Sequence, residues 1–383
     1  MFKKIGILSL SIVTGAITAI TTIIPLIANH YPEMSISRVE TLVTISSLSA
    51  ITTILLNNSL VKKIGLKKVI ILGLVTGMVA GIIPYFYNNY YIFLLSRILL
   101  GIGVGMYSPH AISLISLFYT GNERASLLGI QMGIGAFGNS LLLVCSGWLA
   151  SISWKYAFFT YLWLGIVAIL VWRFVPSIKI HESNNVKSEN KLPKSVLKYL
   201  VLCFATFLII WGVQLKIPTF LFENGITSTE KSGLILSSMN IAGMFAGLSF
   251  GLIYKKIKTY LLPLGFIAAG LSVLSMINSS SWSLIFIFAI IFNFVYSFTG
   301  PTIVLELNQQ ASETQLPKIN SMITLTTILS SYAAPVTWNS LSTIFYSKSD
   351  VAIDSLYIMT LSLFLVGVSL LIYIKYKTCR KKG

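Results

Sequence analysis

Uncharged apolar stretches of about 20 residues recur along the whole chain, and short gaps rich in basic residues separate them. The segment NNSLVKKIGLKKVIILG, residues 57–73, is typical, because its four lysines stand between two apolar runs. The hydrocarbon core of a bilayer is about 30 Å thick, and a helix of about 20 apolar residues crosses it with its backbone hydrogen bonds satisfied internally. This pattern predicts an all-α integral membrane protein.

The composition agrees with that class. Of 383 residues, 55% are hydrophobic and 10% are charged, whereas soluble domains have about 25% charged residues. A net charge of +17 would suggest nucleic acid in a soluble chain, but here the basic residues lie between apolar runs, so we expect no nucleic-acid partner. Cys145, Cys203 and Cys379 lack metal or redox spacing, and we expect neither a metal site nor a cofactor.

Twelve ranges have the length and apolarity of a membrane-spanning helix. The longest hydrophilic stretch, residues 176–195, lies near the middle of the chain and predicts a cytoplasmic linker between a six-helix half at 1–175 and another at 196–383. The expected helices are 5–29, 39–60, 67–87, 90–115, 125–149, 154–175, 196–222, 231–254, 260–278, 283–305, 318–343 and 352–374.

Basic residues give these helices an orientation. With the N-terminus in the cytoplasm, 22 of the 28 basic residues fall at cytoplasmic positions, as the positive-inside rule requires. We therefore predict a multi-pass protein of the cytoplasmic membrane, surrounded by membrane lipid, with both termini cytoplasmic. Aromatic residues at 85–91 fit a belt at the outer interface. The six basic residues at other positions are Arg38, Arg97, Lys155, Lys216, Lys231 and Lys348.

The two halves repeat one another. The tripeptide Lys-Lys-Ile occurs at 62–64 and again at 255–257, and Ile-Pro occurs at 24–25 and 217–218, each with an offset of 193. Pro109 and Pro301 are 192 residues apart. These offsets predict a tandem duplication that gives two six-helix bundles related by a pseudo-twofold axis along the membrane normal.

Several motifs resemble those of the major facilitator superfamily of transporters, over essentially the full chain. RILLGIGVG at 97–105 resembles the family's Arg-x-x-x-Gly-x-Gly signature, and SWKYAFF at 153–159 is similar to the entry to its sixth helix. IPTFLFENGITSTEKSGLILSS at 217–238 resembles the passage from helix seven to helix eight. In the loop between helices two and three, Leu60, Lys63, Gly65 and Lys67 match the family's pattern.

Two departures from the family pattern bear on mechanism. Asn58 replaces the first glycine of the loop motif, and Lys62 and Lys255 replace its aspartate in the two copies. We therefore expect the gate to use different charge interactions. Leu142 and Leu143 occupy the place of the Gly-Pro motif of drug:proton antiporters, which weakens an efflux assignment. The expected gating-loop residues are Lys62, Lys63, Gly65, Lys67, Lys255 and Lys256.

The resemblance implies a monomeric secondary active transporter, and no enzyme, that moves a small organic solute by alternating access with proton coupling. An anionic or a drug-like solute fits this expectation. A lipid or lipid-linked flippase on the same scaffold is the alternative. A membrane-embedded transferase is a distant one, because the sequence has no metal-ligand spacing and no nucleotide-binding loop.

In this family, helices one, four, seven and ten line the solute cavity, so polar residues on them are the expected solute-binding residues. Thr18 could equally bond back to its own helix, and Trp211 and Tyr296 could face lipid. Arg97 could pair with Glu40 near the interface, and Lys216 could extend toward the same interface. The expected solute-binding residues are Thr18, Arg97, Trp211, Gln214, Lys216, Asn293 and Tyr296.

Proton coupling requires a titratable group inside the membrane, and this chain has few. Glu306 and His110 are the main candidates, with Glu40 as a third. Glu306 could instead pair with Lys318 at a loop edge, and His110 could be an interfacial residue at a helix end. A uniport mechanism therefore stays open.

Overall fold

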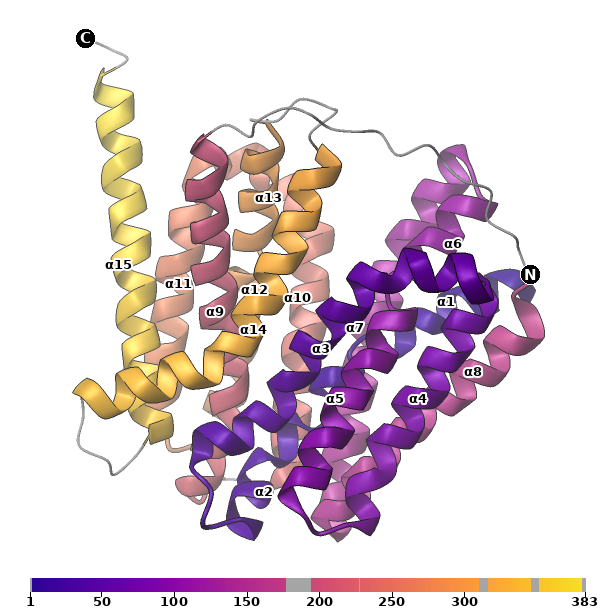
Figure 1. Ribbon diagram of the computed structural model, residues 1–383. Helices are drawn as coiled ribbons and strands as arrows, with labels where there is room; N and C mark the ends of the chain where they lie inside the picture. The colour runs from indigo at the N-terminus through magenta and orange to yellow at the C-terminus, as the bar shows by residue number, and fades with distance from the viewer. Residues whose placement is uncertain (1, 177–193, 227, 310–315, 346–350, 381–383) are drawn as a thin grey trace. The chain divides into compact units, whose positions relative to one another are not determined.

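The computed structural model describes the chain except residues 1, 177–193, 227, 310–315, 346–350 and 381–383. Throughout the described part, every regular element is an α-helix or a short 3-10 helix (Figure 1). The all-α prediction is confirmed. Most of the predicted linker at 176–195 lies outside the described residues.

The helices form two compact units. Unit 1 comprises Met1–Asn185 and Ser228–Ser237, and unit 2 comprises Val186–Thr227 and Ser238–Gly383. The helices before the linker are α1 (Phe2–Ile12), η1 (Ala16–Thr18), η2 (Thr21–Ile23), α2 (Ile24–His30), α3 (Ile36–Ile64), α4 (Leu66–Phe86), α5 (Tyr90–Tyr107), α6 (His110–Phe118), α7 (Gly121–Ile152), η3 (Trp154–Tyr161) and α8 (Leu162–Phe174). Those after it are α9 (Lys194–Glu223), α10 (Thr229–Ile257), η4 (Lys258–Tyr260), α11 (Leu261–Ile277), α12 (Trp282–Tyr296), α13 (Thr299–Gln309), α14 (Leu316–Phe345) and α15 (Val351–Arg380).

Ten stretches of the described chain are long and apolar enough to cross a membrane. One of them, Thr229–Ile277, has 49 residues and contains both α10 and α11. As one straight helix it would measure about 73 Å, more than twice the hydrocarbon thickness. The protein is therefore a multi-pass membrane protein, while the count of twelve crossings stays a prediction.

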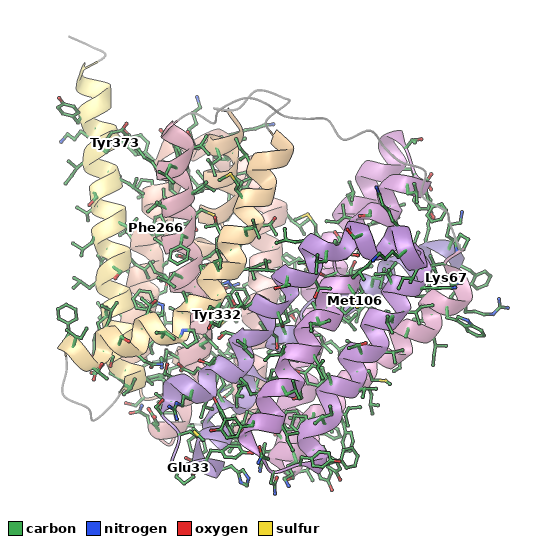
Figure 2. The ribbon with its side chains drawn as sticks, in the orientation of Figure 1. Glu33, Lys67, Met106, Phe266, Tyr332 and Tyr373 are labelled. Atoms are coloured by element: carbon green, nitrogen blue, oxygen red, sulfur yellow. The ribbon has the colours of Figure 1, made fainter. Side chains whose placement is uncertain are left out.

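Side chains on the outer faces of these helices suit a lipid solvent. Leu248, Leu252 and Tyr373 are large and strongly exposed, and Figure 2 shows Tyr373 on α15. Water-soluble monomers rarely expose continuous apolar surface of this kind. The exposed apolar side chains therefore accord with the apolar spans.

Helix bounds support the tandem repeat. Helices α3 and α10 each have 29 residues, and both bounds of α10 follow those of α3 by 193 residues. The same offset separates the end of α2 at His30 from the end of α9 at Glu223. The offset read from short sequence matches therefore extends to whole helices.

The predicted loop between the second and third helices is a single residue. Helix α3 continues through Lys62 and Lys63 to Ile64, and α4 begins at Leu66. Gly65 between them has φ 88° and ψ 146°, which only glycine adopts readily. The equivalent residue in the second copy, Lys258, has φ 53° and is the one non-glycine residue with positive φ among those described.

The span predicted at 5–29 is present as Phe2–His30, but it is not one continuous helix. Helix α1 ends at Ile12, and the chain passes through the 3-10 turns η1 and η2 before α2 begins at Ile24. Thr14 Oγ1 donates to the carbonyl of Ser11 at 2.8 Å, and Thr18 Oγ1 donates to that of Gly15 at 3.0 Å. These side-chain bonds accompany the break.

Glycines allow α5 to approach two neighbours at once. A Cβ on Gly101 would lie 2.1 Å from the carbonyl oxygen of Ser46 on α3, and one on Gly103 would lie 2.6 Å from that of Gly73 on α4. A Cβ on Gly105 would again lie 2.5 Å from a carbonyl of α3. The Arg-x-x-x-Gly-x-Gly motif is therefore a packing motif here, as small residues are in membrane helix pairs.

Candidate functional site

Arg97 lies in the interior of unit 1 and is 1% exposed. Its Nη1 donates to the hydroxyl of Tyr161 at 2.9 Å, and its Nη2 donates to the carbonyls of Gly81 at 3.1 Å and Ala80 at 3.4 Å. Pro84 follows Ala80 by four residues and has no N–H for that carbonyl. The proline therefore leaves an acceptor on α4 that the guanidinium of α5 uses.

Aromatic rings surround the same guanidinium. Its carbon lies 5.3 Å from the ring centre of Phe93, 5.6 Å from that of Phe158 and 5.0 Å from that of Tyr161. These cation–π contacts and hydrogen bonds hold Arg97 within unit 1, an arrangement that favours a structural role. Its role in solute binding stays a prediction, as does the proton-coupling role of Glu40, which is also buried.

A second buried node lies where the fourth span breaks between α5 and α6. Pro109 cannot donate to the carbonyl of Gly105, and Asn57 of α3 supplies the missing donor, with Nδ2 at 2.9 Å. The same Nδ2 donates to the carbonyl of Met106 at 3.2 Å. The Oδ1 of Asn57 lies 3.0 Å from Nε2 of His110, which is 8% exposed. The proton-coupling candidate is therefore bonded into the break between α5 and α6.

A tyrosine stands next to a helix break in each half; the sequence analysis missed Tyr107 and assigned Tyr296 to the solute site. The hydroxyl of Tyr107 donates to the carbonyl of Val13 at 2.7 Å, at the end of α1. The hydroxyl of Tyr296, at the end of α12, donates to the carbonyl of Thr206. Val13 and Thr206 are 193 residues apart, but the tyrosines are 189 apart, so a fixed sequence offset does not pair them.

Hydroxyl groups of the first span contact α7. Besides its bond to its own turn, Thr18 Oγ1 donates to Oδ1 of Asn139 at 3.1 Å. The hydroxyls of Thr22 and Ser146 are 3.2 Å apart. Thr18 thus bonds both to its own backbone and to another helix.

Unit 2 buries a cation. Lys216 of α9 is 1% exposed, and its Nζ donates to Oδ1 of Asn339 on α14 at 2.5 Å. Its burial, together with this bond to a buried amide, argues against a lysine that extends to the membrane surface.

Amide groups of α9 and α12 form a short chain. Asn293 Nδ2 donates to the carbonyl of Met239 at 2.5 Å, which leaves its Oδ1 to accept from Nε2 of Gln214 at 3.4 Å. One turn earlier on α9, the indole Nε1 of Trp211 is buried, and no described residue accepts its hydrogen. The structure thus places four predicted solute residues, Trp211, Gln214, Lys216 and Asn293, within unit 2.

Tyr296 is a core residue of unit 2. Its ring stacks on Phe292 at 5.4 Å and meets Phe266 edge-on at 5.8 Å. The buried side chain therefore does not face lipid. From the end of α12, its hydroxyl bonds to the carbonyl of Thr206 on α9. A solute-binding role for Tyr296 stays a prediction.

Glu306 lies on α13, half-buried, and accepts a hydrogen bond from the hydroxyl of Tyr199 at 3.5 Å. The side chain of Lys318, its alternative partner, lies outside the described residues. A proton-coupling role for Glu306 stays a prediction.

The predicted gating lysines lie at helix ends. Lys62 and Lys63 are in the last turn of α3, and Lys255 and Lys256 are in that of α10, where a positive charge interacts favourably with the helix dipole. Lys67 donates to the carbonyl of Trp172 at 2.7 Å, near the end of α8 (Figure 2). Their role in gating stays a prediction.

The fold agrees with one family. The model of the Major Facilitator Superfamily matches residues 6–335. The chain belongs to this superfamily. The predicted resemblance and fold are confirmed, and the facilitator fold explains the paired units.

Curated relatives and solved structures agree with this assignment. A "Protein TsgA homolog" of Buchnera aphidicola subsp. Schizaphis graminum is 25% identical over 63% of this chain and 63% of its own length, so the chain spans less than two thirds of this relative. The "Multidrug transporter protein MdtP" of Bacillus subtilis is 29% identical over 35% of this chain and 25% of its own.

Two solved transporters share the fold. The POT family transporter PepTSo superposes with a TM-score of 0.72 at 10% identity, covering 98% of each chain. A bacterial homologue of the human lysosomal transporter Spinster, in an inward-facing and occupied conformation, gives 0.73 at 14% identity and covers 98% of this chain and 96% of that one.

Proposed function

We propose that this facilitator moves a small organic solute with an anionic group across the cytoplasmic membrane by alternating access, driven by protons. Membership of the superfamily supports transport, and the tandem repeat supports alternating access. The buried Lys216 supports the anionic group.

The argument from Lys216 is energetic. A lysine in the interior of a membrane protein is costly to insert, by about 2.5–3.5 kcal/mol at mid-membrane, and such residues are usually functional or paired. Asn339 is a neutral amide that accepts a hydrogen bond from the ammonium and so orients it. A carboxylate of the solute would make a charge-assisted hydrogen bond with the same ammonium.

Other predicted solute residues of unit 2 suit the rest of an organic solute. Trp211 offers an apolar ring surface and an N–H whose hydrogen no described residue accepts. Because Asn293 takes the Nε2 of Gln214, the amide oxygen of Gln214 is directed away from that contact. Together these side chains offer a cation, a donor, an acceptor and an apolar surface.

A thermal-stability screen tests this proposal. The purified transporter is heated with a library of small carboxylates and the neutral amide of each, since a ligand that binds only the native state at 100 times its Kd stabilises it by about 2.7 kcal/mol. We expect stabilisation by a carboxylate but not by its amide. The effect should disappear in Lys216→Gln and persist in Lys198→Gln, an exposed lysine on the same helix. Equal stabilisation by acid and amide would contradict the proposal.

A drug-like solute is the second candidate, because the similar protein MdtP carries the name of a multidrug transporter. The same screen distinguishes it. Neutral apolar compounds that stabilise the wild type and Lys216→Gln equally would favour this candidate over an organic anion.

Proton coupling is tested at Glu306. In proteoliposomes with an imposed pH gradient, Glu306→Gln should weaken gradient-driven accumulation more than exchange between two filled compartments. Equal loss of both activities, or no loss, would remove Glu306 from the coupling mechanism. His110 and Glu40 are the other titratable candidates.

A further inference from the structure

The hydrogen bonds around Asn57 determine where the proton of His110 lies. Nδ2 of Asn57 lies within 2.9 Å and 3.2 Å of two carbonyl oxygens, those of Gly105 and Met106, which can only accept. The nitrogen of the amide must therefore face them, because the flipped amide would place oxygen against oxygen. Oδ1 then faces Nε2 of His110 at 3.0 Å and needs a hydrogen from it.

It follows that Nε2 of His110 carries the hydrogen, and the neutral ring keeps a lone pair on Nδ1. This Nδ1 is buried, and it has no hydrogen-bond partner among the described residues. A proton added there would create an ionised ring with a buried N–H that lacks an acceptor. Both features are unfavourable until water or a polar group reaches the atom.

The ring of His110 also lies at the break in its span, where regular helical hydrogen bonding is interrupted. Helix α5 ends at Tyr107 and α6 starts at His110, and Pro109 removes the helical bond across the break. Asn57 replaces that bond from α3, and the same amide holds His110. Movement of the break would therefore also expose the ring.

We propose that Nδ1 of His110 is a proton-binding site that fills only when the break between α5 and α6 opens. This inference deepens the proton coupling proposed above, because it names the atom that takes the proton and the movement linked to it. The packed arrangement of the break holds His110 neutral, and the open arrangement binds one proton. Acid therefore favours the open form.

Among the described residues, charged groups lie on each element that packs against α6; on α5, Arg97 bonds to Tyr161 in the interior of unit 1. On α1, Lys3 Nζ lies 4.3 Å from the ring centre of Phe118, and Lys4 pairs with Glu123 of α7 at 2.7 Å. On α3, Lys62 and Lys63 are exposed in the last turn, and Arg38 and Glu40 lie near the opposite end. Tyr107 of α5 bonds to Val13.

Histidine-selective nitrogen NMR tests the protonation directly. The chain has three histidines, His30, His110 and His181, so labelled protein gives at most three imidazole spin systems, each with two nitrogen signals. His110→Gln identifies the signal of interest; if that variant fails to fold, His30→Gln and His181→Gln identify it by elimination. We expect Nε2 protonated and Nδ1 unprotonated at neutral pH. The opposite tautomer, or an imidazolium at that pH, would overturn the proposal.

Hydrogen exchange tests the linked opening. The segment 105–118 is followed in wild type and in His110→Gln at the same pH, so that intrinsic exchange rates cancel. Glutamine can keep the bond to Asn57 but cannot titrate. Below about pH 6.5, where a water-exposed imidazole is protonated, we expect wild-type protection to fall relative to the variant by up to about tenfold per pH unit.

A parallel pH dependence in the two proteins would overturn the proposed linkage. Neither measurement requires transport or an identified solute. Failure of the transport experiments with intact titration of His110 would therefore count against the proposed function alone.

Discussion

Replacing Tyr161 by phenylalanine removes one oxygen atom from the Arg97 site and keeps the ring. The guanidinium Nη1 then loses its acceptor at 2.9 Å in a site where Arg97 is 1% exposed. The cation–π contact, with the ring centre 5.0 Å from the guanidinium carbon, is retained. Hydrogen bonds to charged groups contribute about 1.5–3 kcal/mol, so we expect Tyr161→Phe to lower the free energy of unfolding by this amount.

The assay is reversible unfolding in mixed micelles, followed by circular dichroism. Tyr156→Phe is the matched control, because Tyr156 lies on the same element η3 and its ring stacks on Tyr85, while its hydroxyl makes no hydrogen bond to the described residues. It should cost less than about 0.5 kcal/mol, as surface substitutions usually do. In a double-mutant cycle with Arg97→Met, the coupling energy should approach the full 1.5–3 kcal/mol, since Tyr161→Phe then removes a hydroxyl that has lost its donor.

A coupling energy near zero would refute the reasoning, as would a Tyr161→Phe variant no less stable than Tyr156→Phe. The experiment also separates two roles of Arg97. If Tyr161→Phe leaves stability unchanged but alters which compounds stabilise the protein, then Arg97 belongs to a solute site. Its burial in unit 1 would then not reflect a structural role.

Further predictions concern packing, backbone conformation and a helix end. Gly101→Ala should cost about 1–3 kcal/mol in unfolding free energy, because the new Cβ would meet a carbonyl of α3 at 2.1 Å; Gly129→Ala, with no atom within 4 Å, should be neutral or stabilising by up to about 1 kcal/mol. Gly65→Ala should cost about 1–2 kcal/mol from backbone strain alone, since no neighbour lies within 4 Å, whereas Lys258→Gly should be neutral or stabilising by up to about 1 kcal/mol. The free energies of unfolding of these variants are measured by the same unfolding assay. Equal costs for Gly65→Ala and Lys258→Gly would contradict the strain argument. Lys67→Gln should increase hydrogen exchange in the last turn of α8, by an amount equivalent to about 0.3–1 kcal/mol; unchanged exchange would show that its bond there contributes nothing.

Most of the fold was predictable from the length of the apolar stretches and from the basic gaps between them. In a bilayer each span must form its own backbone hydrogen bonds, so it appears in the sequence as a long apolar run. The conformation inside a span is less visible. The first span has an unbroken apolar run, yet it passes through 3-10 turns, where Thr14 and Thr18 bond to carbonyls three residues earlier. Hydropathy cannot distinguish these states, because both bury the same side chains.

Of each buried contact, the carbonyl acceptor was predictable from the sequence and the donor was not. A proline within a helix has no N–H to donate to the carbonyl four residues earlier. Pro84 therefore predicts that the carbonyl of Ala80 lacks its helical donor, and Pro109 predicts the same for Gly105. The donors, Arg97 and Asn57, come from other helices. Arg97 stood out as a charge inside a span, whereas Asn57 looked like a residue near a loop. Only the packing of α3 against α5 brings Asn57 to its carbonyl.

Comparison of the two copies shows where the duplicated unit has changed its chemistry. At the offset of 192 that pairs Pro109 with Pro301, His110 corresponds to Thr302, and at the offset of 193 Asn57 corresponds to Phe250, which packs in an apolar cluster. In the other direction, Lys216 corresponds to the buried Ile23. The proposed proton site thus exists in one copy and the proposed anion site in the other. Two sites on different copies, with no shared residue, can affect each other's occupancy only if both bias the same conformational equilibrium. Coupling of proton and solute in this transporter therefore requires that protonation of His110 change the affinity for the solute, and that the solute change the affinity of His110 for its proton by the same factor.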